Sequence, residues 1–182
     1  MPESSTEDFR RQTEQWLSQC DRLLFHRGPD SGGTIIEERV AVGARRLRIH
    51  DLSMSADQPF EGQDGRISLV YNGAIFNFRD LRRELESEGY TFTTDGDTEV
   101  IATGYAAWGE SVFARFDGMF AVAILDRARK RLVLSRDKLG IKPLFLFRNE
   151  KFWAFSSEIK PLLAHSEIPR EVNREAVSEQ LA

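Results

Sequence analysis

The sequence of 182 residues contains one cysteine, Cys20, and only three histidines. A single cysteine cannot form a disulfide bond within the chain or build a zinc site of several cysteines. The histidines, His26, His50 and His165, are scattered and lack the spacing of metal ligands. The sequence therefore has neither a disulfide framework nor a metal-binding motif.

Long hydrophobic runs and an excess of positive charge are also missing. No apolar stretch approaches the roughly 20 residues of a membrane-spanning helix, and the N-terminus, MPESSTEDFRRQ, is polar rather than signal-like. With 29 acidic and 25 basic residues, the formal net charge is −4. That charge gives no electrostatic reason to expect nucleic acid or an anionic membrane as a partner. We therefore expect a cytoplasmic protein that binds neither.

The chain does have the composition of one folded domain. Hydrophobic residues make up 41% and charged residues 30% of the sequence, which is an ordinary globular balance. Thirteen phenylalanines supply much of the expected core. A chain of 182 residues can bury one substantial core but is short for two domains.

The periodic segments indicate an α+β fold. Apolar spacing predicts helices at about 7–24, 78–88, 98–108, 110–116 and 158–164, and β-type segments at 34–43, 46–50 and 67–71. Two hairpins are expected at 119–137 and 144–157. Ser4 and Glu7 fit a capping box before the first helix, and Asp97 fits an N-cap. Helices grouped between antiparallel strands pack on the faces of sheets.

The most informative stretch is 67–77, which reads ISLVYNGAIFN. Taken alone, Asn72-Gly73 is most often a hairpin turn. However, a helical pattern rather than a second strand follows, so we place the dipeptide at the end of a strand. There, a side-chain amide and a backbone N–H can converge on one point, as stabilisation of a tetrahedral oxyanion requires.

Eight motifs then occur in a fixed order: HRGPD at 26–30, RRLRIHDLS at 45–53, QPF at 58–60, VYNGAIFNFRDLRRELE at 70–86, GDTEVI at 96–101, GMFAVAILD at 118–126, RDKLGIKPL at 136–144 and FSSEIKPLL at 155–163. Over about residues 20–165, this order resembles the class II glutamine amidotransferase domain of the asparagine synthetase family. The resemblance implies a four-layer αββα sandwich of two mainly antiparallel sheets, the N-terminal-nucleophile hydrolase fold.

The resemblance also implies a reaction and its partners. The family domain hydrolyses L-glutamine to glutamate and ammonia, which passes through a tunnel to a synthetase domain or subunit. That second domain uses ATP and magnesium to activate aspartate or a similar carboxylate, whereas the glutaminase domain itself needs no cofactor. We expect residues 1–165 to form the amidotransferase domain and 166–182 to lead toward the synthetase part. A homodimer is a further option.

Matching positions imply the site residues. Arg46 would bind the α-carboxylate of glutamine and Asp97 its α-ammonium group. The pocket would also be lined, mostly through backbone, by Leu47, Ile49 and His50. Taken alone, Arg46 resembles a surface arginine on a half-exposed strand, and Asp97 a helix cap.

Asn72 and Gly73 match the oxyanion hole of the family, but two neighbouring features depart from its pattern. The family nucleophile is a cysteine that becomes the first residue and begins a strand reading like Cys-Gly-Ile. Here Met1 is followed by Pro2, and no such strand is present. Ala74 stands where most members carry a glutamate that helps bind the ammonium group. Loss of that charged partner would cost about 1–3 kcal/mol of glutamine affinity.

Two functions therefore remain open. The chain is either the glutaminase part of a glutamine-hydrolysing, asparagine-synthetase-like enzyme whose start is truncated or misassigned, or a pseudoenzyme. The pseudoenzyme would be a glutamine-binding, regulatory or scaffold domain, because losing a covalent nucleophile can cost about a millionfold in turnover. A missing central strand also leaves unpaired edges, so we expect the chain alone to be marginally stable.

Overall fold

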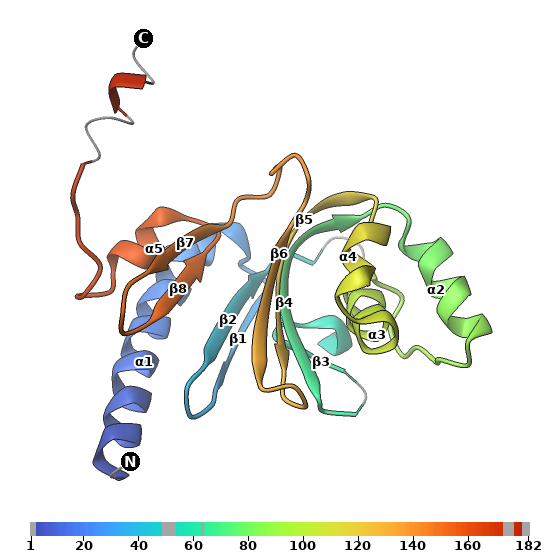
Figure 1. The fold of residues 1–182 in the computed structure, drawn as a ribbon, viewed down its shortest axis with the longest axis horizontal. Helices are drawn as coiled ribbons and strands as arrows, with labels where there is room; N and C mark the ends of the chain where they lie inside the picture. The colour runs from blue at the N-terminus through green and yellow to red at the C-terminus, as the bar shows by residue number, and fades with distance from the viewer. Residues whose placement is uncertain (1–2, 49–53, 63, 173–176, 180–182) are drawn as a thin grey trace.

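A computed structural model describes residues 3–48, 54–62, 64–172 and 177–179. Figure 1 shows helices on the two outer sides of the molecule and two layers of strands between them. The expected αββα order of layers and the α+β class are therefore confirmed. None of the helices in the described part of the chain is long and apolar enough to cross a membrane.

One β layer is a continuous antiparallel sheet with the order β3-β4-β5-β6. Its strands are β3 (Phe60–Glu61), β4 (Ile67–Ile75), β5 (Gly118–Asp126) and β6 (Arg131–Arg136). β4 and β5 pair along their whole length, from Ile67 opposite Asp126 to Ile75 opposite Gly118. The hairpin expected at 119–137 is confirmed as β5 and β6.

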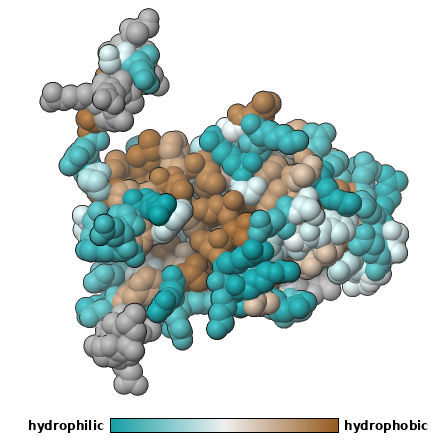
Figure 2. Space-filling model, in the orientation of Figure 1, coloured by the Kyte–Doolittle hydropathy of each residue, from teal (hydrophilic) through white to brown (hydrophobic). Residues whose placement is uncertain are grey.

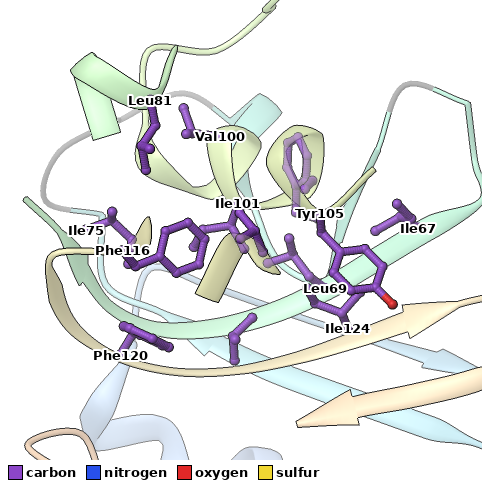
Figure 3. Packing of buried hydrophobic residues seen from close by; sticks show 14 of the residues in the cluster. Ile67, Leu69, Ile75, Leu81, Val100, Ile101, Tyr105, Phe116, Phe120 and Ile124 are labelled. Carbon is purple, nitrogen blue, oxygen red and sulfur yellow. The ribbon is translucent and has the colours of Figure 1, made fainter. Parts of the chain in front are cut away.

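Helices cover one face of this sheet: α2 (Phe78–Ser87), α3 (Asp97–Trp108) and the short α4 (Val112–Arg115), which follows the 3-10 turn η3 (Gly109–Ser111). Figure 3 shows Ile101 and Tyr105 of α3 packed toward Leu69 of β4 and Ile124 of β5. All four side chains are essentially inaccessible to solvent. Burial of each such side chain contributes about 1.5–3 kcal/mol, so this side of β4 is firmly held.

The second β layer is divided into two hairpins. β1 (Ser31–Ile36) pairs with β2 (Ala41–Arg46), and β7 (Phe145–Arg148) pairs with β8 (Trp153–Ser156), which confirms the expected hairpin at 144–157. Within the described residues, neither hairpin pairs with the other. The outer helices α1 (Glu3–Leu24) and α5 (Ile159–Leu163) cover this layer, and Trp16 Nε1 donates to the Pro161 carbonyl at 2.8 Å.

Several predicted boundaries are wrong. α1 begins at Glu3, so Ser4 lies inside the first turn and is not its N-cap. The segment predicted at 34–43 is not one strand, because the chain reverses between β1 and β2, where the Glu37 N–H donates to the Val40 carbonyl. Of the segment predicted at 46–50, Arg46 ends β2, Leu47 and Arg48 are not β-structure, and residues 49 and 50 lie outside the described part of the chain.

The strand predicted at 67–71 continues to Ile75, so Asn72-Gly73 lies within β4 rather than at its end. The pairing partners Ala121 and Phe120 on β5 hold this dipeptide in extended conformation. The Asn-Gly turn tendency is therefore overridden by the ladder with β5.

Glu99 provides a test of how α3 is anchored. Its carboxylate is 1% exposed and accepts hydrogen bonds from the backbone N–H and hydroxyl groups of both Thr93 and Thr94. We expect Glu99→Ala to lower the free energy of unfolding by about 3 kcal/mol, because buried donors lose a charged acceptor. Chemical denaturation measures this. The exposed control Glu86→Ala should cost less than about 1 kcal/mol, and equal losses would contradict the prediction.

The divided layer gives a second stability prediction. In the described part of the chain the two hairpins do not pair with each other, so most of the strand edges between them lack backbone partners, which weakens the sheet. We expect the isolated chain to melt at the low end of the range for ordinary domains, about 45–65 °C. Scanning calorimetry measures the midpoint. A cooperative transition well above about 60 °C would show that the division costs little.

Candidate functional site

A cavity of about 480 Å³ lies between the two β layers. Its walls include strand β2 with the residue that follows it (41–47), and the end of strand β8 with the residue that follows it (155–157). These two strands belong to the two separate hairpins. Residues 70–74 of β4 and 121–123 of β5 form the side facing the continuous sheet. Figure 2 shows hydrophobic residues gathered over β7, β8 and the strands beside them on this face of the molecule. The cavity therefore occupies the division in the second layer.

Asn72 faces this cavity from β4. Side chains alternate between the two faces of a strand, and Val70 packs toward Val42 in the second layer, whereas Leu69 packs among the helices. Asn72 shares the face of Val70. Its Nδ2 atom is buried and has no hydrogen-bond partner among the described residues. Such an unpaired buried donor costs about 1–3 kcal/mol, so this amide is suited to an incoming oxygen acceptor.

The backbone N–H of Gly73 points to the outer edge of β4. N–H groups of alternate residues in a strand point to the same side. The Tyr71 N–H donates to Gln58 Oε1 at 2.6 Å and the Ile75 N–H donates to Asp97 Oδ2 at 2.9 Å, both on the edge opposite β5. Gly73 lies between them, so its N–H belongs to the same edge. Asn72 and Gly73 are thus brought together at one cavity wall.

Glycine is required at position 73 for a reason that the sequence did not reveal. A Cβ atom there would lie 2.2 Å from the Met119 carbonyl oxygen on β5. The absence of a side chain at position 73 therefore allows the close approach of the neighbouring strand β5.

Asp97 is the first residue of α3, but its predicted N-cap role is wrong. Gly96 occupies the cap position and no side chain caps the helix. Instead, Asp97 Oδ2 accepts hydrogen bonds from the Tyr71 hydroxyl at 2.7 Å and from the Ile75 N–H. Burial and the negative charge of Asp97 raise the pKa of Tyr71, so the phenol stays protonated and donates. Oδ1 takes no part in these bonds, and Asp97 lines the cavity.

Arg46 is not the surface arginine that its sequence context alone indicates, because its side chain is only 10% exposed. Its Nη1 atom donates to Asp57 Oδ1 at 2.6 Å. Asp57 also accepts hydrogen bonds from Arg48 and from the Ser31 hydroxyl. The hydrogen bonds from Arg48, Arg46 and Ser31 lower the pKa of Asp57 to about 2.

Two residues at this site were missed by sequence reasoning. Asp57 fixes Arg46, and its neighbour Gln58 is buried and accepts the Tyr71 N–H. The sole sequence signal for Asp57 was an acid in the loop that follows the arginines at 45–48. Gln58 begins the QPF motif at 58–60, but that motif assigned it no role in the site.

The remaining expected site residues have different outcomes. Leu47 and Ala74 line the cavity, although Leu47 is half exposed. Ile49 and His50 lie outside the described residues. Cys20 of α1 is buried and also lines the cavity, as a small apolar residue would. Its burial raises the thiol pKa to about 11, so this side chain is not a thiolate nucleophile at neutral pH.

Comparison with known proteins shows the family of the chain. The family model for the glutamine amidotransferase domain matches residues 4–182. "Asparagine synthetase [glutamine-hydrolyzing] 3" of Bacillus subtilis (strain 168) is 36% identical over 179 residues, covering 94% of this chain and 29% of that protein. "Asparagine synthetase [glutamine-hydrolyzing] 1" of the same organism is 38% identical over 170 residues, covering 93% of this chain and 26% of that protein. This chain therefore spans less than a third of the length of these relatives.

Among solved structures, the chain is similar to the glutamine phosphoribosylpyrophosphate amidotransferase from B. subtilis, complexed with ADP and GMP. The TM-score is 0.58 with 24% identity, over 68% of this chain and 29% of that chain, a likeness that concerns the fold. The family model and the curated relatives show that the chain belongs to the family of glutamine amidotransferase domains.

Proposed function

We propose that this chain is the ammonia-supplying part of a glutamine-hydrolysing, asparagine-synthetase-like enzyme. It would convert glutamine to glutamate and ammonia, for the ATP-dependent amidation of aspartate or a similar carboxylate by a synthetase domain or subunit. Residues 1–165 would form the glutaminase domain, and 166–182 would lead toward the synthetase part. The observation that carries the proposal is the unpaired, buried Asn72 amide in the cavity wall.

The polar groups of the cavity match the parts of glutamine. Arg46 offers a guanidinium group to the α-carboxylate, with which a planar fork can form two bonds. Asp97 offers Oδ1 to the α-ammonium group. The Asn72 amide and the Gly73 N–H would hold the side-chain carbonyl oxygen as it becomes an oxyanion, and each such donor is worth about 3 kcal/mol in the transition state.

A binding-only function is the second candidate, and one observation favours it. Ala74 brings no charge to the cavity wall. Such a domain would hold glutamine for regulation, or serve as a scaffold for a synthetase subunit, without hydrolysing it. The two functions share a binding site and differ only in the nucleophile.

Glutamine binding tests what both functions share. We expect the chain to bind L-glutamine, and Asn72→Ala and Arg46→Gln each to raise the Kd about tenfold or more, because each removes a hydrogen bond from a buried or charged donor. Isothermal calorimetry at millimolar ligand measures this. Arg66→Gln, which removes an exposed arginine paired with Asp64, should leave the Kd unchanged. Absence of any binding by the wild-type chain would overturn the glutamine site.

The nucleophile separates the two functions. We expect that adding a segment before Pro2 that begins Met-Cys-Gly-Ile and is long enough to run back along α1 to the cavity, with removal of its methionine, produces glutamate release from glutamine. The added thiol would attack the side-chain carbonyl carbon of glutamine, whose oxygen Asn72 and Gly73 would hold. The C–N bond would break to release ammonia, and water would hydrolyse the resulting thioester to give glutamate and the free thiol. The same segment with serine in place of cysteine is the control. A folded, glutamine-binding fusion that releases no glutamate would favour the binding-only function.

A further inference from the structure

Asp57 joins three residues that come from two separate parts of the chain. Its Oδ1 atom accepts hydrogen bonds from the Ser31 hydroxyl at 2.9 Å, from Arg46 Nη1 at 2.6 Å and from Arg48 Nε at 3.1 Å. Its Oδ2 atom accepts one from Arg48 Nη2 at 2.5 Å. The Arg48 side chain is about three-quarters buried. These contacts lie directly beside the arginine assigned to the substrate carboxylate.

The two arginines bind Asp57 in different ways. Arg48 binds Asp57 bidentately, because its Nε donates to Oδ1 and its Nη2 donates to Oδ2. Arg46 donates to Asp57 from Nη1. A bidentate pair is stronger and more directional than a single charged hydrogen bond. Asp57 therefore fixes the position of the Arg46 guanidinium, while most of its own charge is engaged by Arg48.

This difference matters because Asp57 and a bound carboxylate would compete for the same guanidinium. If Arg48 were absent, Asp57 could turn and take Arg46 bidentately, which would neutralise Arg46. We propose that Asp57 and Arg48 are positioning residues for glutamine binding: Asp57 orients Arg46, and Arg48 prevents Asp57 from displacing the substrate carboxylate. The inference rests on the proposed function and goes beyond it by assigning roles to two further residues.

The surroundings of the pair support this role. The backbone N–H of Arg48 donates to Asp30 Oδ2 at 2.9 Å, which holds residue 48 close to the HRGPD segment. Gln58, next to Asp57, accepts the N–H of Tyr71, the residue before Asn72. The dipeptide Asp57-Gln58 thus sets the distance between the carboxylate end and the oxyanion end of the cavity. Asp30 is a second acid near Arg48, but it contacts the backbone and leaves the guanidinium fork to Asp57.

The test compares two ligands that differ only at the α-carboxyl end: L-glutamine and L-glutamine methyl ester. We expect Arg48→Gln to raise the Kd for glutamine about tenfold and to leave the Kd for the ester within about twofold. Arg48→Lys keeps the charge without the fork and should recover part of the affinity. Arg66→Gln is the matched control, since Arg66 grips Asp64 through Nε and Nη2 on the exposed surface.

A double substitution tests whether Arg48 acts through Asp57. Asp57→Asn should also weaken glutamine binding, because Arg46 loses its anchor. In that background Arg48→Gln should have no further effect, since no competing charge remains. Thermal melts of each variant confirm that folded protein is compared.

The outcomes distinguish failure of the positioning roles of Asp57 and Arg48 from failure of the proposed function. If the wild-type chain binds glutamine, any of three results would overturn the positioning roles alone. These are an unchanged Kd of Arg48→Gln for glutamine, an equal loss of affinity of this variant for the ester, and additive effects in the double variant. No preference of the wild-type chain for glutamine over the ester would overturn the assignment of Arg46, and this proposal with it. No binding of either ligand would overturn the proposed function itself.

Discussion

Among the described residues, the outer edge of β4 beyond residue 69 is held by side chains rather than by another strand. β3 pairs only with residues 68 and 69, and beyond them the Tyr71 N–H is taken by Gln58 and the Ile75 N–H by Asp97. These two bonds bracket Gly73, whose N–H is left between them. A strand in this place would have consumed that donor. The site depends on replacing a strand partner with two polar side chains.

The two faces of β4 serve different purposes. Toward α2 and α3, its side chains enter a large buried cluster that includes Leu69 and Ile75. Toward the second layer, Val70 belongs to a much smaller cluster, and Asn72 borders the cavity. Packed interiors resist displacement, so the helical side supplies rigidity to the strand. Rigidity is what an oxyanion hole requires, because its donors must not reorganise during the reaction.

Local patterns in the sequence predicted the elements but not the contacts that build the site. The helix at 78–87 and the β5–β6 hairpin have strong periodicity and turn residues of their own. By contrast, Asp97 looked like a cap because its neighbours form a helix, yet Tyr71, which is 26 positions away, holds its carboxylate. The roles of Asp57 and Gln58 likewise come from partners 11 and 13 residues away, across a loop without periodicity. Such roles depend on tertiary structure, which periodicity does not contain.

Ala74 shifts the balance of the proposed site toward its carboxylate end. With no acid at position 74, Asp97 Oδ1 is the acceptor that the structure offers to an α-ammonium group at this wall. Hydrogen bonds to charged groups contribute about 1.5–3 kcal/mol each, so in the proposed site the absence of an acid at position 74 would leave a larger share of the glutamine affinity to Arg46. The geometry of Arg46 is set by Asp57 and Arg48. The loss at position 74 therefore makes that pair more important here than it would be in a site with both acids.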